Sequence, residues 1–225
     1  MRVPRLGALP GLGGWDEDPL WAPVYDWIVE HPRVGGLAWA VGFQSDLRRL
    51  YAATDELGRL PAGSRVLDVP CGGGVALRGV RRGQGLDYHA VDIAEPMLSR
   101  TRAAARRRGL TDQVRTEQAD VGALPADDAT YDLVVSLTGL HCFPDPAGAI
   151  AELARVLRPG GVVTGSLLFN DSGLHHEAIR RGGRLTGLLG PGLTRAQVRE
   201  LWAAQGVPVE VTWSGAVAYF RGVKG

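Results

Sequence analysis

Short apolar runs alternate with stretches of helical periodicity from about residue 65 onward. Met97, Thr101 and Ala104 lie four and three residues apart, on one face of a helix that turns every 3.6 residues. Strands that alternate with helices form a parallel sheet covered by helices. The first five predicted strands cover residues 65–69, 88–92, 114–118, 131–136 and 162–169.

A second helix is predicted after Pro144 and Pro146. It should stop at residues 159–161, Pro-Gly-Gly, because proline cannot continue a helix and glycine accepts a left-handed turn. Its apolar face would hold Ile150, Leu153, Ala154 and Leu157.

The C-terminal part predicts one more helix and a hairpin. Thr194 followed by Gln197 is a capping-box pattern at a helix start. Residues 207–213 and 216–222 form two extended segments around a Ser-Gly turn. The predicted fold class is therefore α/β: a Rossmann-like, seven-stranded, mostly parallel sheet with helices on both faces and a C-terminal antiparallel hairpin.

The charge balance argues against nucleic acid as a partner. The 25 basic and 24 acidic residues give a net charge of +1, which produces no long-range field. Five arginines crowd the first predicted helix, but without interleaved aromatic residues they indicate a solvated face. They are Arg100, Arg102, Arg106, Arg107 and Arg108.

Cysteine usage and apolar runs favour a cytoplasmic protein. Cys71 and Cys142 form neither a disulfide framework nor a CxxC zinc pattern, so no metal site is predicted. No uncharged run approaches the roughly 20 apolar residues that a membrane span needs. Glycine, proline and acids interrupt the N-terminus where a signal peptide needs an apolar stretch, so we expect no targeting segment.

The strongest chemical pattern is an apolar strand that runs into glycines before a helix, over residues 66–74 (VLDVPCGGG). Glycines here can take positive φ and let a ligand approach main-chain amides and the helix start. Asp92 ends the next strand, 20 residues after Gly72, where a carboxylate can accept from ribose hydroxyls. The spacing alone permits NAD as well as other adenosyl ligands.

The surrounding motifs separate these possibilities, because the chain resembles the class I S-adenosylmethionine (SAM)-dependent methyltransferases. The resemblance is closest to the small-molecule type grouped with ubiquinone and menaquinone methyltransferases. It rests on VLDVPCGGG, VDIAEPML, QADVGALP, YDLVVSLTGLHCFPD and LARVLRPGG, five motifs in order over about residues 65–168.

This resemblance implies SAM as methyl donor and S-adenosylhomocysteine as product. Asp68 and the backbone of Gly72 would hold the methionine end, and Asp92 the ribose. Ile93 and Met97 would flank the adenine, which Asp120 and the backbone of Val121 would recognise. Leu137 and Thr138 would line the sulfonium side. The expected cofactor-binding set is Asp68, Pro70, Cys71, Gly72, Asp92, Ile93, Met97, Asp120, Val121, Leu137 and Thr138.

Pro70 departs from the family pattern, which usually has glycine there. Proline lacks an amide hydrogen, so one backbone hydrogen bond to the cofactor would be absent. We expect the turn to survive, because three glycines follow at residues 72–74.

The predicted function is methyl transfer to a small, apolar or aromatic acceptor at oxygen, nitrogen or carbon. Two alternatives stay open: an NAD-dependent oxidoreductase, disfavoured because the chain has DxPCGGG in place of GxGxxG, and a non-catalytic SAM-fold partner module. The sequence does not define the oligomeric state.

Histidines near the ligand edge are the candidate catalytic residues. His141 follows the fourth strand and would deprotonate or orient the acceptor, or else simply pack the loop. His175 and His176 lie after the fifth strand, where solvent exposure is the plainer interpretation.

The chain is predicted to be one domain over residues 1–225, with a core at 61–225. Residues 1–60 differ in kind, because they hold Trp15, Trp21, Trp27 and Trp39 and read as mostly helical. They would form either a lid over the acceptor or an ordinary part of the packed core.

Overall fold

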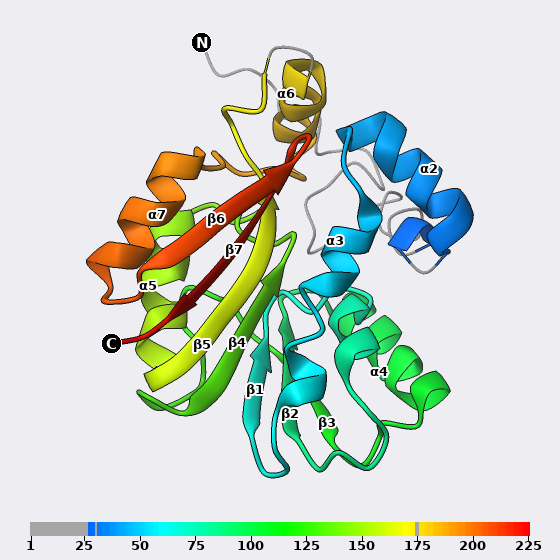
Figure 1. Cartoon of the computed structure of the whole chain (residues 1–225), viewed down its shortest axis with the longest axis vertical. Coiled ribbons are helices and arrows are strands. Elements are labelled where there is room, and N and C mark those ends of the chain that lie inside the picture. Colours follow the sequence, from blue (N-terminus) through cyan, green and yellow to red (C-terminus); the bar gives the residue numbers. More distant parts are fainter. Residues whose placement is uncertain (1–26, 30, 174–175) are drawn as a thin grey trace.

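A computed structural model of the chain describes residues 27–29, 31–173 and 176–225. Its centre is one seven-stranded sheet, with strand order β3-β2-β1-β4-β5-β7-β6 (Figure 1). The strands are β1 (Arg65–Asp68), β2 (Asp87–Asp92), β3 (Val114–Gln118), β4 (Tyr131–Leu137), β5 (Leu157–Leu168), β6 (Val209–Ser214) and β7 (Val217–Val223).

The sheet has the predicted mixture of strand directions. Strands β1 to β5 pair in parallel, whereas β7 is antiparallel to both β5 and β6. Ser214 pairs with Val217 across a two-residue turn, in which Gly215 has a φ of +54°. The Rossmann-like sheet and the C-terminal antiparallel hairpin are therefore confirmed.

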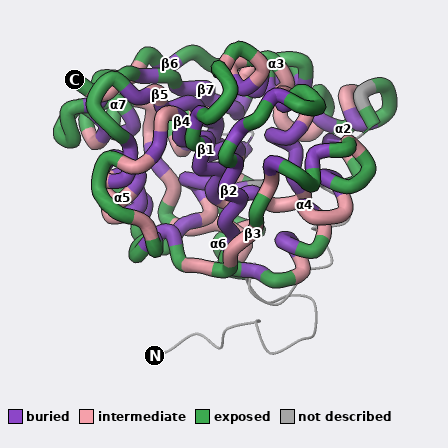
Figure 2. Tube along the Cα trace, turned by 90° about the horizontal axis from the view of Figure 1, so that it is seen from below, coloured by how far each residue is buried: buried purple, intermediate pink, exposed green. Residues whose placement is uncertain are grey.

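Helices cover both faces of the sheet (Figure 1). On one face α5 and α7 pack over a core that includes Leu153 and Trp202, and on the other α3 and α4 pack over a core that includes Leu50 and Leu98. The strands between these layers consist mostly of buried residues (Figure 2). The helices are α2 (Pro32–Phe43), α3 (Leu47–Ala52), α4 (Glu95–Arg108), α5 (Pro146–Val156), α6 (Glu177–Leu185) and α7 (Arg195–Ala204), with 3-10 turns η3 (Leu57–Arg59) and η4 (Val75–Gly79).

The predicted end of the second helix was wrong by a few residues. Helix α5 ends at Val156, and Leu157 takes extended angles and begins β5, where it pairs with Tyr131. Leu157 still donates its amide to the carbonyl of Leu153, as a helix end would. Pro159 disfavours helical angles at the residue before it, so the chain leaves the helix before the Pro-Gly-Gly turn.

The prediction of a helix directly after the glycines was also wrong. The chain forms only the five-residue 3-10 turn η4 between Gly74 and Val80. A side chain at Gly79 would lie 1.9 Å from the carbonyl oxygen of Thr54, so this segment packs closely against the end of α3. A tight turn in place of a full helix allows this close contact.

The N-terminal segment is described only in part. Trp15 and Trp21 lie outside the described residues, and the lid predicted over residues 1–60 stays a prediction. Trp39 on α2 is 1% exposed and packs against Phe43 at a ring distance of 4.8 Å. Within the described part of the chain, the helices are all too short or too polar to cross a bilayer.

Candidate active site

A cavity of about 620 Å³ opens at the carboxyl ends of the parallel strands. Its walls come from the residues that follow β1, β2, β3 and β4, and from Leu168 at the end of β5. Helix α2 and residues 182–189 close the other side. This is the edge at which open α/β sheets bind ligands.

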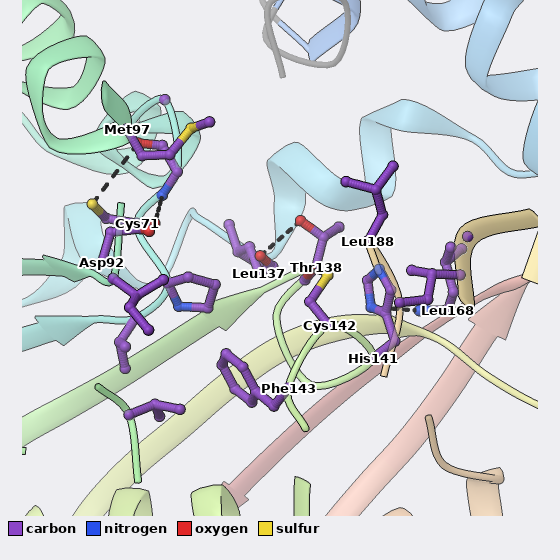
Figure 3. A pocket seen from close by; sticks show the side chains of 18 of the residues that line it. Cys71, Asp92, Met97, Leu137, Thr138, His141, Cys142, Phe143, Leu168 and Leu188 are labelled. Carbon is purple, nitrogen blue, oxygen red and sulfur yellow. Dashed lines mark hydrogen bonds between the residues drawn. The ribbon is translucent and has the colours of Figure 1, made fainter. Parts of the chain in front are cut away.

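The predicted site residues meet at this cavity. All of them except Asp68 contribute to its walls. Figure 3 shows Asp92 and Met97 on one side, Leu137 and Thr138 in the middle, and His141 and Leu188 on the other side. Motifs that are up to 70 residues apart in the chain thus share one space.

The cavity has two chemically different halves. The carboxylate half is lined by residues 69–73, Val75, Asp92, Ile93, Met97 and 119–121. The apolar half is lined by Trp39, Phe43, residues 141–144, Leu168, Gly182, Gly183 and residues 186–189. Leu137 and Thr138 lie at the junction.

Asp92 is hydrogen-bonded to the loop of residues 70–74 that follows β1, here called the glycine loop. Its Oδ2 accepts from the amide of Gly72 at 2.9 Å, and its Oδ1 accepts from the amide of Ala94 at 3.0 Å. Burial raises the pKa of Asp92, although backbone hydrogen bonds from Ala94, Gly72 and Ile93 act to lower it. Each carboxylate oxygen has a second lone pair, so Asp92 can still accept from two adjacent hydroxyls, as a ribose offers.

The main-chain amides of residues 71–74 shape the loop, and the predicted approach of the cofactor to them stays a prediction. The amide of Cys71 donates to Val91 at 2.9 Å, and the amide of Gly74 donates to Cys71 at 2.9 Å. The hydroxyl of Thr101 donates to the carbonyl of Gly72 at 2.7 Å. These amides therefore fix the shape of the loop, with φ of +51° at Gly72 and +84° at Gly74.

Pro70 fits the loop by packing against a second glycine. A β-carbon at Gly139 would lie 2.3 Å from Cδ of Pro70 and 2.9 Å from Oγ of Ser136. The proline ring therefore occupies space that a larger residue at position 139 would need. The turn after β1 keeps its bent course although glycine is absent at position 70.

Asp68 lies behind the cavity instead of on its wall. The carboxyl group is 1% exposed and accepts a hydrogen bond from the hydroxyl of Tyr88 at 2.7 Å. Burial raises the pKa of Asp68 to about 7, and the nearby charge of Asp92 adds to this rise. Asp68 thus supports the end of β1, and its predicted hold on the methionine end of SAM stays a prediction.

The outer end of the carboxylate half is partly open. Ile93 is 47% exposed, whereas Met97 and Val121 are buried. Asp120 is exposed, and its Oδ1 accepts from the amide of Gly122 at 2.8 Å. A flat group between Ile93, Met97 and Val121 would meet apolar side chains with one carboxylate at its edge.

Thr138 has an unusual backbone at the junction of the two halves. Its φ is +53°, a region that a β-branched residue rarely adopts. Its amide donates to Oγ of Ser166 at 3.1 Å, and the thiol of Cys142 donates to its carbonyl at 3.6 Å. Such strain persists only where surrounding contacts impose it, and it is concentrated at functional sites.

His141 lines the apolar half and is tied to the end of β5. The side chain is 7% exposed, and Nδ1 accepts from the amide of Leu168 at 3.2 Å. Burial lowers the pKa of His141 to about 4. The imidazole is therefore neutral near pH 7. His176, by contrast, does not line this cavity, and His175 lies outside the described residues.

The sequence interpretation missed most of the apolar half. Trp39 and Phe43 from α2, and residues 182–189 after α6, line the cavity although they are far from every motif. The tryptophan-rich start and the long interval after β5 were the available signals. Neither signal specifies which residues face a ligand.

The described part of the chain shows no cluster of metal-binding side chains. No three His, Cys, Asp or Glu side chains among residues 27–29, 31–173 and 176–225 gather as a metal site requires. Cys71 and Cys142 do not form a disulfide bond.

Comparisons with known proteins agree with this geometry. Residues 66–161 match the family described as "Methyltransferase domain". The chain is 37% identical over 133 residues to 27-O-demethylrifamycin SV methyltransferase of Amycolatopsis mediterranei, which covers 56% of this chain and 49% of that protein. It is 40% identical over 131 residues to demethylmenaquinone methyltransferase of Thermus thermophilus, which covers 58% of each.

The chain thus spans about half the length of these two relatives. Among solved structures, it resembles the phosphoethanolamine N-methyltransferase 2 of Haemonchus contortus in complex with SAM, with a TM-score of 0.70. That match has 17% identity and covers 90% of this chain and 56% of the other. At this level of identity it shows a shared fold.

Proposed function

We propose that this chain is a class I SAM-dependent methyltransferase that transfers a methyl group to a small, apolar or aromatic acceptor, because residues 66–161 match the methyltransferase-domain family. One observation carries the proposal: the Gly72 amide and the Asp92 carboxylate, 2.9 Å apart, share a cavity with an apolar half. The names of both relatives give a small molecule as the methyl acceptor, which supports the same kind of acceptor here.

The residues of the carboxylate half fit the expected methyl donor. Asp92 would accept from the ribose hydroxyls, because the backbone fixes both of its oxygens and leaves lone pairs available. Ile93, Met97 and Val121 would enclose the adenine, with Asp120 at its edge. SAM supplies an activated methyl group on a positively charged sulfur. Asp92 and Asp120 are the two charged side chains among the described cavity residues, and both suit a cationic ligand.

Positioning is the main contribution of the apolar half. Trp39, Phe43 and Leu188 would hold an apolar acceptor and exclude water from the junction at Thr138. Orienting two bound reactants contributes roughly 7–11 kcal/mol to lowering a barrier. No metal or covalent nucleophile is needed in this proposal. The proposal also includes a cytoplasmic location.

Calorimetry with SAM, S-adenosylhomocysteine and NAD tests the proposal, followed by transfer of labelled methyl to a panel of aromatic acceptors. We expect both sulfur compounds to bind with micromolar or tighter affinity, and NAD at least 100-fold more weakly. Tight binding of NAD alone would favour the oxidoreductase. Failure to bind SAM, S-adenosylhomocysteine and NAD would favour a non-catalytic partner module.

A further inference from the structure

The apolar half contains few groups that could receive a proton. The described residues that line it include no carboxylate, lysine or arginine. Its polar side chains are His141, Cys142 and Thr186, and the Cys142 thiol donates to the carbonyl of Thr138. An acceptor that entered this half with an acidic proton would find His141 as the one imidazole in reach.

The hydrogen bond from Leu168 fixes which nitrogen of His141 carries the proton. A neutral imidazole has one donor nitrogen and one acceptor nitrogen. The amide of Leu168 donates to Nδ1 at 3.2 Å, so Nδ1 is the acceptor and the hydrogen lies on Nε2. The lone pair that a general base would use is therefore already occupied. Figure 3 shows the ring between Cys142, Leu168 and Leu188, with its dashed bond to Leu168.

We propose that His141 donates a hydrogen bond through Nε2–H to the acceptor oxygen, and that the acceptor is a phenol or enol that ionises without help from a protein base. This inference rests on the proposed function and adds the acceptor's reacting group. An oxygen suits such a donor, because it keeps a second lone pair for the methyl group. A neutral amine nitrogen has a single lone pair, which the same hydrogen bond would block.

The atoms and charges of the methyl transfer balance without a protein base. The acceptor's hydroxyl proton passes to the solvent buffer before reaction. A lone pair of the resulting oxyanion forms the new oxygen–carbon bond, while the carbon–sulfur bond breaks and its electron pair stays on sulfur. The products are the neutral methyl ether and S-adenosylhomocysteine. His141 keeps its proton throughout and orients the oxyanion.

Imidazole NMR of the ¹⁵N-histidine-labelled protein tests the protonation state directly. His141 should show the Nε2–H tautomer from about pH 5.5 to 9, with its signals assigned by their loss in His141→Gln. A Nδ1–H tautomer, or conversion to imidazolium near the ordinary histidine pKa, would overturn the donor role. This measurement is made on the wild-type protein without the cofactor, and His141→Gln serves only to assign the signals.

A matched pair of ligands tests the acceptor class. With S-adenosylhomocysteine bound, 2-naphthol should bind and 2-naphthylamine should bind at least 10-fold more weakly. His141→Phe keeps a ring in place but removes the donor, so it should weaken 2-naphthol about 10-fold and leave 2-naphthylamine within about twofold. His31→Phe, the same change at an exposed histidine outside the cavity, should alter neither.

The outcomes separate this inference from the proposed function. If S-adenosylhomocysteine fails to bind, the methyltransferase proposal falls, and this inference with it. If it binds but the amine binds as well as the naphthol, or neither ligand binds, the acceptor class proposed here is wrong. Equal losses for both ligands in His141→Phe would assign His141 to packing alone.

Discussion

The two halves of the cavity are built in different ways. The carboxylate half is made by residues at consecutive strand ends, and hydrogen bonds such as that between Gly72 and Asp92 hold it together. The apolar half is made by α2, residues 141–144 and residues 182–189, which meet only in the folded chain. The first half follows from the order of the strand ends, whereas the second depends on segments far apart in the chain and, in the proposed function, would hold the acceptor.

Helix α6 and residues 182–189, which close the apolar half, are stabilised by hydrogen bonds and close packing. Arg180 on α6 is 7% exposed, and its guanidinium donates to Glu177 at 2.7 Å and to the carbonyl of Gly173 at 3.1 Å. Gly183 packs against Leu189, where a β-carbon would lie 2.5 Å from the leucine side chain. Arg180 thus ties α6 to the loop before it, close packing keeps residues 182–189 compact, and Arg184 donates to Oδ1 of Asn170, just after β5, at 2.8 Å.

The largest expected effect is in the carboxylate half, from Asp92→Ala. The change removes two expected hydrogen bonds to ribose and leaves the amides of Gly72 and Ala94 without their acceptor. Hydrogen bonds to a charged group contribute about 1.5–3 kcal/mol each, so S-adenosylhomocysteine should bind at least ~100-fold more weakly. Calorimetry measures this loss.

Two variants sharpen this prediction. Asp92→Asn should also fail, because its NH₂ group must face one of the two backbone amides that now donate to Asp92. Asp112→Asn makes the same change at an exposed carboxylate outside the cavity and should bind normally. Near-normal affinity in Asp92→Ala would contradict the role of the carboxylate half.

Asp68, which lies behind the carboxylate half, and His141 in the apolar half should change stability with pH in opposite directions. The pKa of Asp68 is raised to about 7, so the folded state holds a proton that the unfolded state releases above about pH 4. Its contribution to the free energy of unfolding is therefore largest at low pH and is lost as the pH rises to about 7. The full difference is on the order of 4 kcal/mol.

His141 acts the other way. Its pKa is lowered from 6.5 to about 4, so the unfolded state binds a proton first as the pH falls. Its contribution is present above about pH 6.5 and is lost toward pH 4, by on the order of 3 kcal/mol. In urea unfolding across this range, Asp68→Asn should differ from the wild type most at high pH, where Asp68 has lost its proton and asparagine stays neutral. His141→Gln should differ most at low pH, where His141 gains a proton and glutamine stays neutral. Parallel pH curves for wild type and variant would refute the corresponding assignment.

These differences explain how far the sequence could be interpreted. Strand positions, the hairpin and the Gly72–Asp92 pairing follow from local patterns, because parallel strands bring their ends to one edge. The η4 turn and the early start of β5 at Leu157 depend on contacts with Thr54 and Tyr131, which no local pattern contains.

The tautomer of His141 is a similar case. The donor that fixes it, the amide of Leu168, is 27 residues away in the chain and is brought close by the pairing of β4 with β5. Sequence placed His141 at the ligand edge but left its role open between base, orienting group and packing. Likewise, nothing local to Trp39 or Leu188 marks either of them as a cavity residue.

Gly139→Ala tests the contact that links the glycine loop to the junction. The new β-carbon would lie 2.3 Å from Pro70 and 2.9 Å from Ser136, so one of the two segments must move. Overpacking of this kind costs about 1–3 kcal/mol of unfolding free energy, and SAM binding should weaken with it. Gly36→Ala on α2 is the control, because its β-carbon meets nothing within 4 Å. It should stabilise the protein by about 0.5–1 kcal/mol.

Thr138→Gly gives the smallest change in stability but a specific test of the junction. Glycine accepts the φ of +53° without the roughly 1–2 kcal/mol that a side chain pays there, and this gain nearly offsets the greater freedom of glycine in the unfolded chain. Stability should therefore change by less than about 1 kcal/mol, while under the proposed function turnover should fall, because Thr138 at the junction of the two halves loses its side chain. Ala129→Gly relieves a similar φ of +54° at an exposed site and should leave turnover unchanged. If the two substitutions had the same effect on turnover, the strain at Thr138 would belong to the fold and not to the reaction.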